Sequence, residues 1–220
     1  MKLAVPTLLL FALLCSCDPA TETVSETPEV TTSDPTENRA QLVDIDSDEA
    51  RIATALLAAP AASRDGAKVI GYNAAGEFVT LREGTNEFIC LADDPNKDGF
   101  NAACYHQSLE PFMMRGRELQ AEGKSAQEIF ALREEEVKSG KLTMGDAGST
   151  LHVYSGPNAT YDPETGKVDG ASYRYVVYMP YATAASTGLP ESPIAPNHPW
   201  IMDPGTHRAH IMISPLKGED

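Results

Sequence analysis

The stretch AKVIGYNAAGEFVTLREGTNEFICL, residues 67–91, decides the fold class of this chain. Its apolar and β-branched residues gather in three short runs, 67–72, 77–82 and 87–91, and segments containing Asn and Gly separate these runs. Runs of this length between turn-forming residues are typical of strands connected by tight turns. The sequence therefore predicts three strands that follow one another as an antiparallel meander.

Patterns typical of helices precede and follow these strands in the sequence. Ser47 stands before acidic residues and the apolar positions of a short helix, as expected of an N-cap. Further along the chain, Ser108 is expected to cap a helix that Gly123 ends. Ser125 with Glu128 then matches the capping box of another helix. We expect the apolar side chains of these helices in the core rather than on a ligand surface.

After residue 140 the pattern returns to strands, at 151–154, 173–179 and 208–213. Between the last two runs lies a long proline-rich loop, 181–206. A loop of this length is either packed onto the sheet or functional. Together these patterns predict one α+β domain, 45–220, with a mainly antiparallel sheet and two or three helices packed on one side.

The N-terminal residues predict export from the cytoplasm. Lys2 precedes a largely apolar run, 3–14, which is too short to span a bilayer as a mature helix. We therefore expect residues 1–16 to be a signal peptide.

The end of this run also suggests how the protein is anchored. Leu14-Cys15-Ser16-Cys17 resembles the bacterial lipobox, in which the final cysteine, here Cys17, carries the lipid. This resemblance implies attachment to a membrane of the cell envelope, with the domain outside the cytoplasm. An ordinary cleaved signal peptide remains the alternative. Asp18 resembles an inner-membrane retention signal of enterobacteria, but that rule is not general, so the inner and outer membranes both stay open.

An acidic tether is expected between the anchor and the domain. Residues 17–44 are rich in Thr, Glu, Pro and Ser, without apolar periodicity, and Arg39 is their only base. Such a segment buries too little apolar surface to offset the entropy lost on folding, which predicts disorder. The whole chain carries a net charge of −15 at pH 7, so a nucleic acid is not expected as a partner.

Cys90 and Cys104 are the two cysteines of the predicted domain. In an oxidising compartment, an isolated pair at this separation is most simply a structural disulfide. A redox pair or thiolate metal ligands remain the alternatives, although the close Cys-x-x-Cys spacing typical of both is missing.

The segment between these cysteines resembles half of a calcium-binding loop. Asp94, Asn96 and Asp98 occupy alternate positions before Gly99, as in loops of the EF-hand or dockerin type. The bidentate acid expected at the twelfth position is replaced by Tyr105. A plain surface turn therefore stands beside the calcium hypothesis, and we expect weak calcium binding at most.

His207 and His210 are the candidates for a transition-metal site. Residues three apart on a strand face opposite sides, so this pair chelates a metal only if His207 lies in the turn before the strand. Zinc or nickel with a carboxylate such as Asp203 would make the protein a metal-dependent periplasmic enzyme. The alternative is that His210 is hydrogen-bonded within the fold and His207 is exposed.

No hydrolase or nucleotide-binding motif is present in the sequence. The leading hypothesis is therefore a non-enzymatic, membrane-anchored domain that binds an envelope protein, a cell-wall component or a small ligand. Its suspected binding surface is the apolar and aromatic stretch 180–200, with Tyr181 and Trp200 as the candidate contact residues.

A wider resemblance accompanies these motifs. Residues 82–86 (REGTN), the cysteines at 90 and 104, and residues 210–215 (HIMISP) resemble a group of secreted bacterial proteins of unknown function. The similar stretches are scattered over residues 67–215. The resemblance implies an exported, disulfide-bonded protein and no particular activity.

Overall fold

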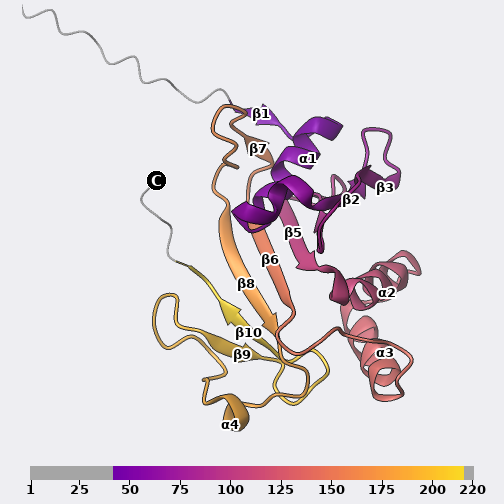
Figure 1. Ribbon diagram of the computed structural model, residues 1–220, viewed down its shortest axis with the longest axis vertical. Coiled ribbons are helices and arrows are strands. Elements are labelled where there is room, and N and C mark those ends of the chain that lie inside the picture. Colours follow the sequence, from indigo (N-terminus) through magenta and orange to yellow (C-terminus); the bar gives the residue numbers. More distant parts are fainter. Residues whose placement is uncertain (1–41, 216–220) are drawn as a thin grey trace, which may run out of the picture. The chain divides into compact units, whose positions relative to one another are not determined.

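The computed structural model describes residues 42–215. The predicted signal peptide, Cys17 and the tether up to residue 41 lie outside this range. An eight-stranded sheet in the order β3-β2-β4-β5-β6-β8-β10-β9 forms the frame of the domain (Figure 1). Its strands are β2 (Lys68–Tyr72), β3 (Phe78–Arg82), β4 (Phe88–Leu91), β5 (Phe100–His106), β6 (Thr150–Gly156), β8 (Ser172–Tyr178), β9 (Trp200–Met202) and β10 (His210–Ile213).

Short helices and a second small sheet surround this frame. A two-stranded sheet joins β1 (Val43–Asp44) to β7 (Thr160–Tyr161). The helices are α1 (Asp48–Leu57), α2 (Glu110–Ala121), α3 (Ala126–Lys138) and α4 (Ala184–Thr187), with 3-10 turns η1 (Ala61–Gly66) and η2 (Gln107–Leu109). Within residues 42–215, no helix has the length and apolar character needed to cross a membrane.

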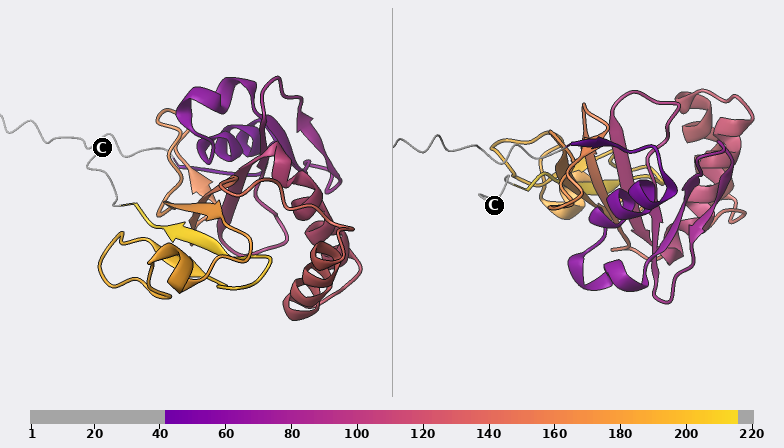
Figure 2. Two further views of the ribbon diagram at one scale, coloured as in Figure 1. Left: turned by 60° about the horizontal axis from the view of Figure 1, so that its bottom comes forward. Right: turned by 90° about the horizontal axis from the view of Figure 1, so that it is seen from above.

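Two hydrophobic cores lie on opposite faces of the sheet. Ala55 of α1 packs with Val69 and Cys90 on one face. Phe112 of α2 packs with Tyr105 on the other face, and α3 lies beside α2 on that side (Figures 1 and 2). The predicted α+β class, a mainly antiparallel sheet with helices packed on one side, is confirmed; α1 additionally covers the opposite face.

Strand β5 lies in the middle of the sheet, although no pattern in the sequence predicts it. Phe100, Ala102 and Cys104 are buried on the α1 side, whereas Tyr105 is buried on the α2 side. A strand covered on both faces lacks the alternation of polar and apolar residues that identifies a half-exposed strand. The small residues of the segment NAAC, which starts at Asn101, also lack the β-branched side chains typical of strands.

The expected meander is wrong for its third strand. Strands β2 and β3 pair antiparallel, but β4 pairs with the other side of β2 and runs parallel to it. The chain crosses the start of β2 between β3 and β4, where Thr85 N and Asn86 N donate hydrogen bonds to the Gly66 carbonyl at 2.8 and 3.1 Å. A Cβ atom at Gly84 would lie 2.5 Å from Lys68 N, so glycine permits this crossing. Strand β3 is consequently left at the edge of the sheet.

The predicted helix caps are partly confirmed. The Ser47 side chain accepts a hydrogen bond from Ala50 N, and Ser125 forms the full capping box with Glu128. Ser108 does not cap α2, because it lies within η2 and α2 starts after it. The hydroxyl of Ser108 contacts the Ser149 hydroxyl at 3.0 Å instead.

A disulfide joins Cys90 and Cys104, as the sequence predicted. The two residues lie directly opposite each other on β4 and β5, and both are fully buried. The bond therefore links the parallel part of the sheet to its antiparallel part within the α1-side core.

We predict that the double substitution Cys90→Ala/Cys104→Ala lowers the free energy of unfolding by about 3 kcal/mol, because opening a loop of this length restores entropy to the unfolded chain. Urea titration under oxidising conditions measures the change. Reduction of the wild-type protein should give a loss of similar size. A loss below about 0.5 kcal/mol in both experiments contradicts the structural role of the bond.

Candidate functional site

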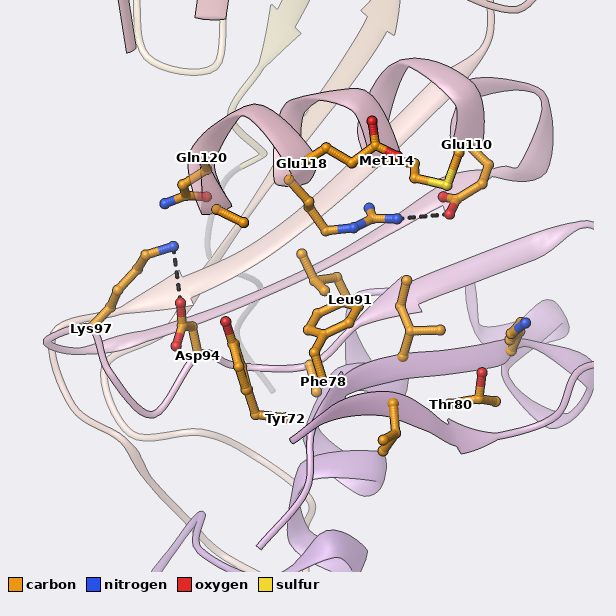
Figure 3. A pocket seen from close by; sticks show the side chains of 16 residues that line it. Tyr72, Phe78, Thr80, Leu91, Asp94, Lys97, Glu110, Met114, Glu118 and Gln120 are labelled. Atoms are coloured by element: carbon orange, nitrogen blue, oxygen red, sulfur yellow. Dashed lines mark hydrogen bonds and ion pairs between the residues drawn. The ribbon is translucent and has the colours of Figure 1, made fainter. Parts of the chain in front are cut away.

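A groove with a volume of about 700 Å³ lies between α2 and the strands β2, β3 and β4 (Figure 3). Its floor is the face of these strands that α1 does not cover, and α2 forms its wall. A groove of this size is within the range of sites that hold small molecules or short peptide segments.

The floor arises from the alternation of side chains along the strands. Lys68, Ile70 and Tyr72 point into the groove from β2, while Val69 packs in the core on the opposite side. Phe78 of the edge strand β3 lies beside Tyr72, with 5.4 Å between the ring centroids in an edge-to-face arrangement. Phe78 is 44% exposed, so the floor presents an aromatic surface to solvent at its outer end.

The wall arises from the helical spacing of α2. Met114 and Arg117 line the groove, whereas Phe112 and Leu119 face the core and are buried. Met114 is 46% exposed and faces the groove across from the strands (Figure 3). The apolar groups on both sides of the groove therefore stay accessible to a ligand.

A polar network holds the wall against the sheet. The Tyr105 hydroxyl donates a hydrogen bond to Glu110 Oε2 at 2.5 Å, and Arg117 donates to Glu110 Oε1 at 2.7 Å and to the Tyr105 oxygen at 3.1 Å. Burial and the Glu110 carboxylate raise the pKa of Tyr105, so the phenol remains a donor. The Arg117 guanidinium carbon also lies 5.8 Å from the centre of the Phe78 ring. Arg117 thus joins the wall to the floor.

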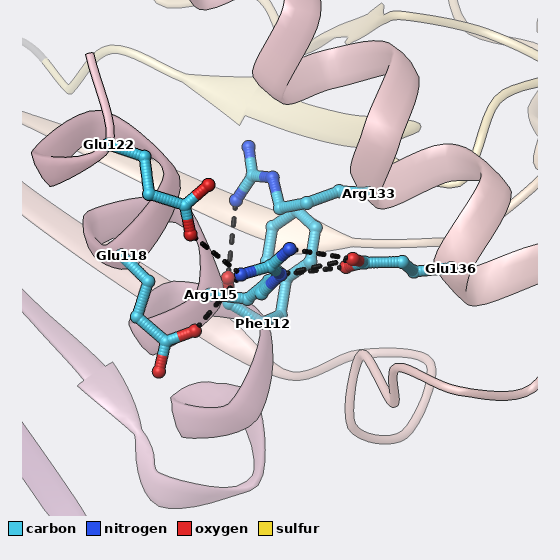
Figure 4. A network of polar contacts seen from close by, with 6 residues as sticks. All are labelled: Phe112, Arg115, Glu118, Glu122, Arg133 and Glu136. Carbon is cyan, nitrogen blue, oxygen red and sulfur yellow. Dashed lines mark hydrogen bonds and ion pairs between the residues drawn. The ribbon is translucent and has the colours of Figure 1, made fainter. Parts of the chain in front are cut away.

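A second polar network attaches α2, the wall of the groove, to α3. Arg115 of α2 forms a two-pronged contact with Glu136 of α3, with N–O distances of 2.9 to 3.1 Å, and further ion pairs with Glu118 and Glu122 (Figure 4). On the same interface, the Arg133 guanidinium stacks 3.9 Å from the centre of the Phe112 ring. These contacts hold α2 and α3 together, so α2 presents a rigid surface to the groove.

Two of the calcium candidates, Asp94 and Asp98, line different depressions of the surface. Asp94 lines one end of the groove, whereas Asp98 lines a separate shallow depression of about 530 Å³. Asp94 accepts hydrogen bonds from the Asn96 backbone and side chain at 3.0 and 3.1 Å and pairs with Lys97 at 3.1 Å. Partial burial raises the pKa of Asp94, but these hydrogen bonds outweigh it and lower the pKa. Calcium binding stays a prediction.

The histidine candidates have separate surroundings. His207 lies in the turn before β10, as a metal pair would require, but its side chain is 0% exposed and packs between Phe130 and Phe112, at centroid distances of 4.9 and 5.7 Å. The Nδ1 of His210 contacts the Arg208 carbonyl at 2.7 Å, and Asp203 pairs with Arg208 at 2.7 Å. Among residues 42–215, no group of three or more His, Cys, Asp or Glu side chains is placed to share a metal ion.

Tyr181 and Trp200 do not line the groove. Tyr181 is 43% exposed, and its backbone has a positive φ of 63°, which strains a residue with a large side chain. Trp200 is partly buried at the start of β9, opposite Met212 of β10. The end of the expected loop thus joins the sheet as β9, whereas residues 191–197 are exposed, and the suspected binding surface there stays a prediction.

The sequence does not indicate that Phe78, Met114 and Arg117 line a groove. Phe78 belongs to a predicted strand, but the pattern does not show that this strand is an edge. Met114 follows two core positions of α2, and only its helical phase relative to Phe112 distinguishes it from them. The position of Met114 around the helix, relative to Phe112, is therefore the one signal in the sequence that identifies a residue of α2 in the groove.

Comparisons with protein-family models, curated proteins and solved structures found no match for this chain. The site is therefore interpreted from its own geometry: an exposed aromatic ring on an edge strand, an exposed Met on a facing helix, and charges that pair with one another between them.

The buried imidazole of His207 predicts a pH dependence of stability. Burial lowers its pKa to about 4, and neither ring nitrogen has a hydrogen-bond partner among the described residues, although Glu134 lies 4.0 Å away. Because the unfolded chain binds this proton at a higher pH than the folded one, stability falls as the pH drops from about 6.5 to about 4. Titration of His207 accounts for up to about 3 kcal/mol of this fall in the free energy of unfolding.

We predict that His207→Phe removes the contribution of His207 to the pH dependence of stability, because Phe fills the same aromatic cluster without titrating. Urea unfolding of both proteins at pH 7, 5.5 and 4 measures the difference. The partly buried His152 and the buried His210 titrate in both proteins, so their contribution cancels. Parallel pH profiles of the variant and the wild type would contradict the assignment.

Proposed function

We propose that this chain is an exported lipoprotein of the bacterial cell envelope whose domain binds a segment of another envelope protein in the groove. The observation that carries the binding role is the pair of exposed apolar side chains, Phe78 and Met114, on the floor and the wall of one groove. Monomeric proteins seldom leave an aromatic ring and a Met exposed in one concavity unless they serve recognition.

Binding of a ligand would bury the parts of Phe78 and Met114 that are exposed to water in the free protein. Complete burial of a Phe or Met side chain stabilises by about 1.5–3 kcal/mol, so covering the exposed halves of Phe78 and Met114 contributes about 1 kcal/mol each. Met adapts its shape to different partners because its side chain is unbranched and flexible. The groove is thus suited to apolar anchor residues.

The charges of the groove favour the same kind of ligand. Glu110 pairs with Arg117, and Asp94 pairs with Lys97, so the charged groups largely neutralise one another. A groove without a dominant charge selects its ligand by apolar contacts and by backbone hydrogen bonds rather than by a phosphate or a metal ion. The net charge of −15 also disfavours a nucleic acid.

The proposed anchoring explains where such binding would take place. Lipid on Cys17 would fix the chain to the inner or the outer membrane. Val43 and Asp44, predicted as the end of the acidic tether, belong to β1, so the tether that would let the domain reach its surroundings ends before them. A tethered domain meets membrane-associated partners at a raised effective concentration, so modest affinity is sufficient.

We predict that Phe78→Ser and Met114→Ser each weaken peptide binding about fivefold, which corresponds to about 1 kcal/mol. The probe is a peptide selected on the purified full chain from a random phage-displayed library, and calorimetry measures its affinity.

Leu42→Ser is the matched control, because Leu42 is also 46% exposed but lies outside the groove. Its affinity should stay within twofold of the wild type. The proposed function fails if no peptide is selected, or if the groove variants bind as well as the control.

A further inference from the structure

We infer that the partner binds as an extended strand that adds to the free edge of β3 and places alternate side chains in the groove. This inference rests on the binding role proposed for the groove and names the form of the partner. Three features of the described domain support it: the hydrogen-bonding direction of β3, the absence of Pro and Lys along residues 78–80, and the position of the groove beside them.

The backbone groups of Phe78 and Thr80 point away from the sheet. Asn73 N donates to the Glu77 carbonyl at 2.9 Å, which makes these two residues a hydrogen-bonded pair of the hairpin. Hydrogen-bonded and non-hydrogen-bonded pairs alternate along antiparallel strands, so the pairs Tyr72–Phe78 and Ile70–Thr80 are of the second kind. The N–H and C=O groups of Phe78 and Thr80 therefore face outward, where no strand within residues 42–215 pairs with them.

The first three residues of β3 carry little that prevents strand pairing. Residues 78–80 are Phe-Val-Thr, without Pro, Lys or an inward-pointing charge, and the register shift of the β2–β3 pairing falls after Thr80. The opposite edge, β9, has only three residues and lies between Pro199 and Pro204. The contrast indicates that the β3 edge is left open for a partner.

The groove lies where the side chains of an added strand would go. Phe78 and Thr80, the residues with outward backbone groups, also point their exposed side chains into the groove. In an antiparallel addition, the partner residues hydrogen-bonded to Phe78 and Thr80 point their side chains to the same face. Their neighbours on that face are Met114 and Arg117 of α2.

Charge favours a different chain over a second copy of this one. Two copies that each carry a net charge of −15 repel each other. Antiparallel self-pairing centred on Thr80 would also place Glu77 opposite Glu83 at both ends, and like charges in opposite positions destabilise a sheet. The chemistry of the edge therefore fits a neutral or basic segment with apolar residues at alternate positions.

The test is a proline substitution that removes one outward N–H. Thr80→Pro removes a donor that β2 does not use, so the β2–β3 hairpin is retained, as circular dichroism and thermal melting should confirm. We expect Thr80→Pro to weaken binding of the library-selected peptide at least tenfold. Thr80→Val keeps the N–H and removes only the hydroxyl, so it should bind within about threefold of the wild type.

A scan of N-methylated peptides supplies the second readout. Methylation of the peptide residues that face Phe78 and Thr80 should abolish binding, and methylation of the residues between them should be tolerated, which gives a period of two. Losses at a spacing of three or four would indicate a helical ligand and overturn the inference.

The outcomes separate this inference from the proposed function. If Thr80→Pro binds like the wild type while Phe78→Ser does not, the groove binds its ligand without strand addition. If neither substitution weakens binding of the peptide, the groove is not the binding site. If sedimentation shows a dimer that Thr80→Pro dissociates, the edge is occupied by a second copy, and the inference fails.

Discussion

The burial of β5 on both faces is the constraint on which the rest of the structure depends. Phe100, Ala102 and Cys104 belong to the core beneath α1, and Tyr105 belongs to the core beneath α2. The strand pairs with β4 on one side and with β6 on the other, and a disulfide ties it to β4. A strand with both faces and both edges covered fixes the positions of the layers on either side of it.

The groove follows from this arrangement. The Tyr105 hydroxyl fixes the start of α2 through Glu110, and Arg115 fixes α2 to α3 through Glu136. The helix therefore stands over the sheet at a set position, while β2 and β3 extend beyond it with an uncovered face. The connection at Gly84 sends β4 to the far side of β2, which leaves β3 as the edge. Core packing and chain crossing together create the open groove and the free edge beside it.

The sequence predicts the local elements better than their arrangement. The strands around Val69 and Val79 and the helix capped by Ser125 follow from β-branched residues and caps, which act over a few positions. Strand β5 was missed because small residues buried on both faces show no alternation. The pairing of β4 with β2, and the exposure of Met114, depend on contacts between distant segments, so no local pattern contains them. The groove could not be predicted for the same reason.

Hydrogen exchange of the β3 amides reports whether a strand adds to this edge. We expect the library-selected peptide to slow exchange at Phe78 and Thr80, whose N–H groups face outward. Val79 should change little, because its N–H already pairs with β2. Protection confined to the loop at residues 181–206, with unchanged exchange along β3, would exclude strand addition and place the binding surface at Tyr181 and Trp200 instead.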